Sequence, residues 1–215
     1  MLAALALSLA ASVWAAPVAA VRPVEPLRLI IAGPPASSKG TNADRLVEEF
    51  GVVKITVSDL LSAHVAATDD QVVAAQMEKG ELVDSGLVLR LLAARFSQDD
   101  VRQRGYVLDG SPRRPEEVEG LRAILSGELA PHGVVHLNAP DEELRRRSRV
   151  RGRKGETDKV FDDRLSHHRT ETVPALADLA RTARFVEVDV SSQDREANWE
   201  RVRAAVASLF DGSRP

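Results

Sequence analysis

The feature that most constrains this chain is a short loop that joins a strand pattern to a helix pattern. Residues 27–32 are apolar except for Arg28, and they lead directly into Gly-Pro-Pro-Ala-Ser-Ser-Lys-Gly-Thr at 33–41. An amphipathic stretch follows at 41–50. In a strand–loop–helix unit of this kind, the backbone N–H groups of the loop and of the helix N-terminus converge on an anion. The sequence therefore predicts a phosphate-binding loop within an α/β protein.

The loop supplies the groups that bind phosphate. Small residues let successive N–H groups point inward, Lys39 reaches the β- and γ-phosphates, and the Thr41 hydroxyl suits Mg²⁺. Ser38 stands where the motif has glycine, so a left-handed backbone there would cost about 1 kcal/mol. The alternative is an ordinary Gly/Ser turn. The predicted ATP-binding residues of the loop are Gly33, Pro34, Pro35, Ala36, Ser37, Ser38, Lys39, Gly40 and Thr41.

Short apolar runs and longer amphipathic stretches alternate along the rest of the chain. This alternation is typical of a parallel sheet with helices on both faces. Two regions break the pattern, an Arg-rich one at 145–159 and a helical insertion around 68–86. The predicted strands are 27–32, 52–57, 105–108, 134–137 and 185–188, and the predicted helices are 41–50, 58–66, 70–79, 85–97, 115–125, 141–150, 160–180 and 195–210.

Composition narrows the classes of function. The chain has 215 residues, of which 44% are hydrophobic and 28% charged, as expected of one globular domain. Its formal charge is −3 and its aromatic content is 4%, which argues against nucleic acid as a partner. Cysteine is absent, which excludes disulfides, a thiolate nucleophile and a cysteine-based zinc site. Because the chain has no overall positive charge, any nucleotide must be bound by charged groups close to its own site.

The first 20 residues carry no charged side chain and are predicted to be a targeting segment, with 21–26 as a Pro-containing linker. The apolar run is too short to span a membrane, so no membrane association is expected after processing. Residues 11–17 resemble the junction between signal and transit peptides in plastid proteins of algae with secondary plastids. We favour this bipartite plastid leader. A secretory signal, a misplaced start codon and a buried apolar arm are the alternatives.

Four further stretches, taken with the loop, carry a resemblance to a known family. They are Ile-Thr-Val-Ser-Asp-Leu-Leu at 55–61, Met-Glu-Lys-Gly-Glu-Leu-Val at 77–83, Asp-Gly-Ser-Pro-Arg at 109–113 and Ala-Pro-Asp-Glu at 139–142. In this order they resemble the adenylate kinases of the nucleoside monophosphate (NMP) kinase family, especially the plant and algal chloroplast type.

The resemblance implies a P-loop NTPase-type fold of three α/β/α layers around a five-stranded parallel sheet. It implies an NMP kinase domain at 27–211, with a helical NMP-binding insertion at about 57–86 and a short lid at about 148–158. The implied reaction converts MgATP and AMP into two ADP by in-line phosphoryl transfer, in a monomer. The implied ligands are ATP, a nucleoside monophosphate with AMP favoured, and Mg²⁺ bound with ATP.

The resemblance also assigns roles to single residues. Thr41, Asp59 and Asp109 are implied to hold the metal, the two carboxylates through water. A helix cap is the alternative role for Asp59, and a turn for Asp109. Arg113 is implied to clamp the monophosphate, the alternative being a solvated turn arginine. The implied NMP-binding residues are Val57, Ser58, Val83, Gly110, Arg113, Glu117, Arg153 and Arg164.

The Arg-rich run at 145–154 contrasts with the acidic protein, and its charges repel one another unless an anion lies among them. By position, Arg147 and Arg151 resemble lid-entry arginines that bind ATP, while Arg153 and Arg164 resemble the pair that converges on the phosphates. A solvated helix face is the alternative. The implied catalytic residues are Lys39, Arg113, Arg153 and Arg164.

Departures from the family pattern cluster at the monophosphate site. Ser58 replaces a glycine, and Ser62 replaces an arginine whose contact with the AMP phosphate is worth about 1.5–3 kcal/mol. Glu117 replaces the glutamine that reads adenine, and Arg114 is a nearby candidate to replace the lost arginine. These departures leave a UMP/CMP kinase and a catalytically inactive ATP-binding relative as alternatives. A kinase of the shikimate or gluconate type would share only the loop.

Overall fold

The structure is a computed structural model that describes residues 25–152 and 155–210. The predicted leader at 1–20, residues 21–24 of the predicted linker, and Arg153 lie outside the described residues.

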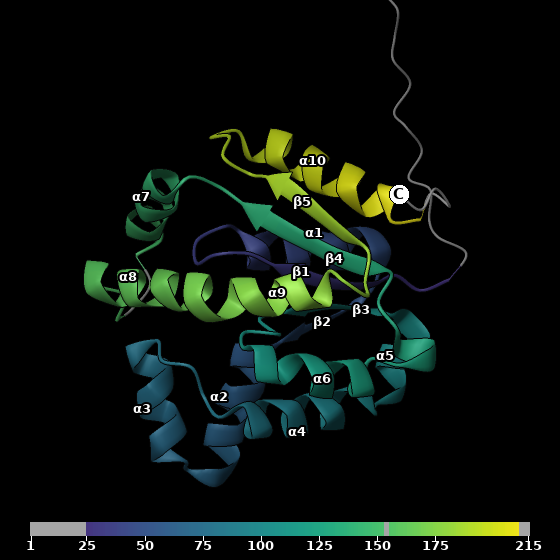
Figure 1. The fold of residues 1–215 in the computed structure, drawn as a ribbon, viewed down its shortest axis with the longest axis horizontal. Coiled ribbons are helices and arrows are strands. Elements are labelled where there is room, and N and C mark those ends of the chain that lie inside the picture. Colours follow the sequence, from purple (N-terminus) through teal and green to yellow (C-terminus); the bar gives the residue numbers. More distant parts are fainter. Residues whose placement is uncertain (1–24, 153–154, 211–215) are drawn as a thin grey trace, which may run out of the picture.

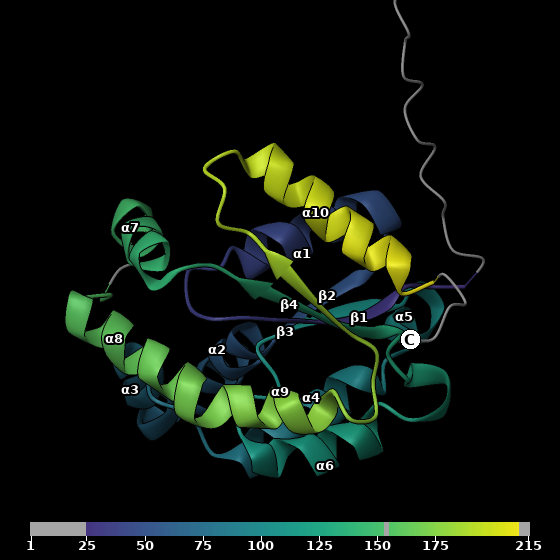
Figure 2. The ribbon, with the colours of Figure 1, turned by 45° about the horizontal axis from the view of Figure 1, so that its top comes forward.

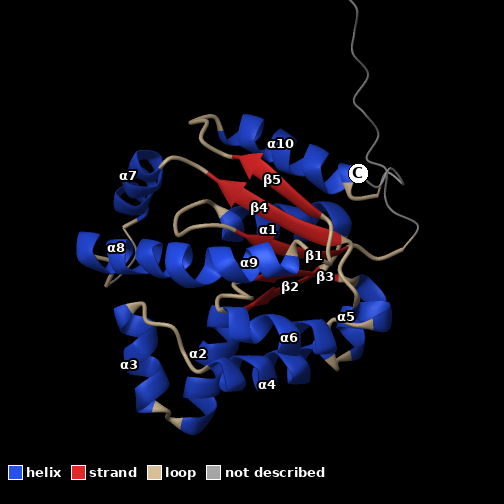
Figure 3. Ribbon diagram, viewed as in Figure 1, coloured by secondary structure: helices blue, strands red, loops and turns tan. Residues whose placement is uncertain are grey.

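Five parallel strands form a single sheet in the order β2-β3-β1-β4-β5 (Figures 1 and 3). Their carboxyl ends meet at one edge, where open α/β sheets bind their ligands. All five predicted strands and the predicted α/β fold class are confirmed. The bounds are β1(Arg28–Ala32), β2(Val53–Thr56), β3(Tyr106–Asp109), β4(Gly133–Asn138) and β5(Phe185–Asp189).

Helices cover both faces of the sheet (Figure 2). Successive residues of β1 point to opposite faces, so Leu29 and Ile31 pack with α1 and α10 while Ile30 packs with α4, α6 and α9. No described helix has the length and apolar character that crossing a membrane requires. The helices are α1(Lys39–Phe50), α2(Val57–Thr68), α3(Gln71–Lys79), α4(Ser85–Phe96), α5(Asp99–Arg104), α6(Pro115–Ile124), η1(Gly127–Leu129), α7(Asp141–Arg151), α8(Asp158–His167), η2(His168–Thr172), α9(Val173–Leu179) and α10(Arg195–Ser208).

The predicted helix at 160–180 is confirmed but contains a π turn, and one short helix was missed. The stretch at 160–180, expected to be one helix, consists of α8, the π-helical turn η2 and α9 in direct succession. A π turn holds one residue more than an α turn. The apolar residues of the stretch keep the ordinary helical spacing, so the sequence gives no sign of the extra residue. The six-residue α5 was not predicted because it is too short to display a helical period.

The predicted monophosphate insertion at about 57–86 contains α2 and α3, which pack against each other, and the first residues of α4. The predicted lid at about 148–158 includes the last turn of α7 and the first residue of α8. These two segments belong to elements on the same side of the molecule, the side toward which the arrowheads of β4 and β5 point (Figure 1). The fold therefore places both of them beside the loop that follows β1.

Candidate active site

The loop between β1 and α1 closes around the side chain of Lys39. Its ammonium Nζ donates hydrogen bonds to the carbonyl oxygens of Gly33 and Pro34, each at 2.9 Å. Ser38 has φ 67° and Ala36 has φ 61°, both in the left-handed region. Gly33 has φ 145°, which favours glycine. The loop thus adopts a turn that a non-glycine residue enters only at a cost, and Ser38 incurs that cost.

The charge of Lys39 is incompletely compensated. Burial lowers its pKa to about 8, the nearby Asp109 carboxylate acts in the opposite direction, and Arg113 lowers the pKa further. A buried ammonium with a lowered pKa is stabilised by an anion placed beside it. Phosphate oxygens in the loop would supply that negative charge.

A cavity of about 1040 Å³ opens in front of the loop. It is also bounded by the helical insertion, by α7 and by the chain that follows β5. The predicted site residues that line it are Pro35, Ala36, Ser37, Ser38, Lys39, Gly40, Thr41, Val57, Ser58, Asp59, Val83, Asp109, Gly110, Arg113, Glu117, Arg147, Arg151 and Arg164. Gly33 and Pro34 do not line it, and they contribute the carbonyl oxygens that hold Lys39.

Two carboxylates face the cavity near the loop. Asp109, 8% exposed, ends β3, and Asp59 is exposed in the first turn of α2. The helix-cap alternative for Asp59 was wrong, because the N-cap position belongs to Thr56 and Asp59 lies inside the helix. In the described ranges, no group of three or more His, Cys, Asp or Glu residues is placed to hold a metal. Thr41, Asp59 and Asp109 fit instead the few hard oxygen donors that Mg²⁺ takes when phosphates and water complete its shell.

Ser62, predicted to replace a phosphate-binding arginine, lies on α2. The exposed Ser62 donates its hydroxyl to the carbonyl of Ser58 at 2.8 Å and does not line the cavity. Arg114 does not line the cavity either, and its guanidinium donates to the carbonyls of Val83 at 3.2 Å and Leu82 at 3.3 Å. Arg113 is therefore the arginine that the turn after β3 presents to the cavity.

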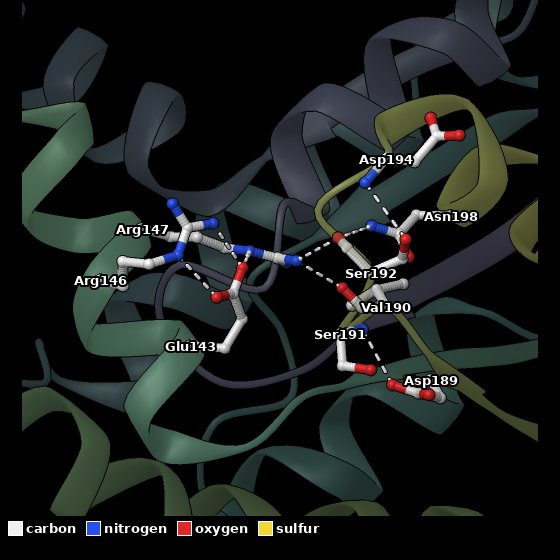
Figure 4. Close-up of polar contacts among 9 residues, drawn as sticks. All are labelled: Glu143, Arg146, Arg147, Asp189, Val190, Ser191, Ser192, Asp194 and Asn198. Atoms are coloured by element: carbon white, nitrogen blue, oxygen red, sulfur yellow. Dashed lines mark hydrogen bonds and ion pairs between the residues drawn. The ribbon is translucent and has the colours of Figure 1, made fainter.

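Arg147 extends from α7 to the loop between β5 and α10 (Figure 4). Its Nε donates to Glu143 at 2.7 Å, and its Nη2 donates to the carbonyls of Val190 at 2.6 Å and Ser192 at 3.0 Å. Among the described residues, its buried Nη1 has no hydrogen-bond partner, and neither does the buried Oδ1 of Asn198. Arg147 and Asn198 both line the cavity, although these two atoms have almost no exposed surface.

The residues that follow β5 were missed in the sequence analysis. Val190, Ser192 and Asn198 line the cavity. The carbonyls of Val190 and Ser192 accept hydrogen bonds from Arg147, and the Asn198 amide donates to the Ser192 carbonyl at 2.7 Å. The available signal was their position after the fifth strand, because the carboxyl ends of parallel strands share one edge of the sheet.

Two of the predicted phosphate-binding arginines meet on one buried carboxylate. Glu156, whose side chain is 3% exposed, accepts hydrogen bonds from Arg151 at 2.7 Å, from the Ser148 hydroxyl at 2.6 Å and from Arg164. A single anion thus holds Arg151 and Arg164 within reach of each other at the wall of the cavity.

The first strand of the parallel sheet runs into a loop whose carbonyls bind Lys39, and arginines face this loop across a cavity. These features define the class of phosphate-loop nucleotide-binding proteins. A family model described as adenylate kinase matches residues 31–183. The chain is 35% identical over 183 residues to the adenylate kinase of Synechococcus sp. (strain RCC307), a match that covers 84% of this chain and 98% of the relative. It is 34% identical over 176 residues to the adenylate kinase of Methylobacterium radiotolerans, covering 76% and 88%. The chain belongs to the adenylate kinase family.

Proposed function

We propose that the protein transfers the γ-phosphoryl group of ATP to the phosphate of AMP and releases two ADP. The observation that carries this proposal is one cavity that joins the phosphate loop to Arg113 and to the paired arginines Arg151 and Arg164. Membership of the adenylate kinase family favours AMP over the pyrimidine acceptors, and it favours a kinase over the inactive relative and the small-molecule kinases.

The residues of the site supply position and fixed charge, because phosphoryl transfer leaves little covalent chemistry for a protein to do. Lys39 binds the β- and γ-phosphates from the loop. Arg113 holds the acceptor phosphate, and Arg164 stabilises charge on the transferring group. Arg153, predicted to act with Arg164, belongs to the same proposal. In a cavity closed to water each of these charges acts more strongly than it would in solvent.

Mg²⁺ is part of the proposal. Bound with ATP, the ion neutralises charge on the phosphates. The Thr41 hydroxyl would bind it directly, and the Asp59 and Asp109 carboxylates would hold its water molecules.

The ATP base is proposed to lie near Arg147. Its guanidinium offers a planar cation at the wall of the cavity. The planar face of a guanidinium stacks on aromatic rings, as a purine requires.

The activity is tested by coupled detection of diphosphate formation, with MgATP and each of AMP, CMP, UMP and GMP, on protein that begins at Val21. Arg113→Ala is expected to lower turnover with AMP by about 10²–10³-fold. The matched control is Arg102→Ala, because Arg102 is exposed on α5 and does not line the cavity. Equal turnover in the two variants, or turnover confined to CMP or UMP, would contradict the proposal.

Plastid import through residues 1–20, and a monomeric state, are also proposed. A fluorescent protein fused behind residues 1–26 is expected to enter the plastid of an alga with secondary plastids, and its secretion would contradict the import. Sedimentation of the full 215-residue chain as a 23.3 kDa species would support the monomer, and a species of twice that mass would contradict it.

A further inference from the structure

The backbone of Arg113 is held by side chains from two other elements. Arg113 lies in the segment between β3 and α6, which belongs to no helix or strand. Its N–H donates to Oε2 of Glu117 at 2.8 Å, and its carbonyl accepts the hydroxyl of Thr172 at 3.0 Å. Backbone groups that lack a regular ladder need such partners when they are buried. The backbone N–H and the backbone carbonyl of Arg113 are thus both hydrogen-bonded, each to a different side chain.

The carboxylate of Glu117 is committed to this turn. Glu117 is 3% exposed, and its Oε2 also accepts the hydroxyl of Ser111 at 3.2 Å. Its Oε1 is 3.5 Å from the hydroxyl of Ser85, which bonds Glu116 more closely at 2.9 Å. An ionised carboxylate only accepts hydrogen bonds, so it suits a turn that presents two donors. An amide in its place has one acceptor atom and adds two donors.

Thr172 reaches the turn from the π-helical segment η2. It is buried at the end of η2, and its partner Arg113 is 59 residues away in sequence. The helix that follows, α9, packs against α6, which carries Glu117 (Figure 2). Single π turns inside helices occur frequently at functional sites. Here the π turn places a hydroxyl beside the carbonyl of the residue that faces the cavity.

The side chain of Arg113 is restrained as well. Its Nε donates to the carbonyl of Gly110 at 3.0 Å. Gly110 has φ 96°, and a Cβ at this position would lie 3.2 Å from Nη2 of Arg113. Because the backbone and the Nε of Arg113 are both held by the turn, a small movement of the turn carries the guanidinium with it.

We propose that Glu117 and Thr172 are positioning residues that clamp the backbone of Arg113 from both sides and so fix its guanidinium where the acceptor phosphate binds. This inference rests on the proposed function, because it assumes that Arg113 binds that phosphate. It assigns Glu117 to the turn rather than to reading the acceptor base.

The test is a double-mutant cycle with steady-state kinetics. Thr172→Val removes the hydroxyl and keeps the shape of the side chain, whereas Thr172→Ser keeps the hydroxyl. Thr172→Val and Glu117→Gln are each expected to lower kcat with AMP by about tenfold or more, since small misplacements at a reacting centre cost up to about 10²-fold. The KM for ATP stays within about twofold, and Thr172→Ser retains the wild-type rate. In an Arg113→Ala background, Thr172→Val causes no further loss.

Three outcomes would overturn the clamp. They are an equal loss from Thr172→Val with and without Arg113, wild-type kcat in Thr172→Val, and a changed AMP-to-CMP preference in Glu117→Gln at unchanged kcat. Melting curves identify variants that fail to fold. If Glu117→Gln is one of these, the comparison of Thr172→Val with Thr172→Ser tests the clamp by itself. Failure of the proposed function is distinguishable, because the wild type would then show no AMP-dependent turnover or Arg113→Ala would keep full activity.

Discussion

Gly33→Ala is expected to destabilise the fold strongly although it adds one methyl group. Gly33 has φ 145°, a conformation that costs other residues about 1–3 kcal/mol. The added Cβ would lie 2.4 Å from the carbonyl oxygen of Leu137 on β4 and 2.8 Å from the hydroxyl of Ser37. The β4 backbone cannot move away cheaply, and such overpacking costs about 1–3 kcal/mol more. We expect a loss of about 3 kcal/mol in the free energy of unfolding.

Thermal unfolding followed by circular dichroism measures this loss. For a chain of this size, 1 kcal/mol corresponds to about 2–4 °C, so Gly33→Ala is expected to lower Tm by about 6–12 °C. The matched control is Gly40→Ala in the first turn of α1, where no atom lies within 4 Å of the added Cβ. Because alanine favours a helix over glycine by about 0.5–1 kcal/mol, this control keeps or raises Tm. Equal Tm values for the two variants would refute the reasoning.

Three further changes test the electrostatics of the site. Because burial lowers the pKa of Lys39 to about 8 and bound phosphate raises it, ATP binding should take up more protons at pH 9 than at pH 7. Calorimetry in buffers of different ionisation enthalpy measures this uptake, and its persistence in Lys39→Arg would contradict the assignment. Ser62→Arg should lower the KM for AMP by about tenfold, whereas Ala63→Arg on the same exposed surface should not, and equal effects would contradict a phosphate contact. Hydrogen bonds from Arg146, and then from Arg147, lower the pKa of Glu143 to about 2, so its ionised form stabilises the fold at neutral pH and this contribution is lost as pH falls from about 4.5 toward 2. Glu143→Gln should therefore lower Tm at pH 7, with a difference from wild type that narrows at pH 3; a constant difference would contradict this assignment.

Two features made parts of the site predictable from the sequence. One is the succession of residues within a single stretch of chain, and the other is the rule that the carboxyl ends of parallel strands meet at one edge of the sheet. The loop around Lys39 follows β1 and opens α1, so its motif and its context lie in one stretch of chain. Asp109 ends β3, and the parallel sheet brings its carboxyl end beside that loop. These two relations were sufficient to bring the ATP-side and metal-side candidates to one cavity.

The parts that were not predicted depend on partners distant in the chain. Thr172 reaches Arg113 through one hydrogen bond and a π turn. Neither feature can be seen in the spacing of the apolar residues along the helix. Arg114 was a candidate for an empty phosphate contact, yet backbone carbonyls of Leu82 and Val83, about 30 residues earlier, bind it. Which partner a side chain bonds depends on which elements pack together in three dimensions, and the spacing of residues in the sequence does not show this.

The central claim is that this cavity carries phosphoryl groups from ATP to AMP rather than to water. Phosphorus NMR of the protein with MgATP and AMP measures this most directly, because it follows ATP, AMP, ADP and inorganic phosphate together. The account predicts two ADP formed for each AMP consumed, with no accumulation of inorganic phosphate. Release of inorganic phosphate at a rate independent of AMP, or unchanged ATP and AMP, would contradict it.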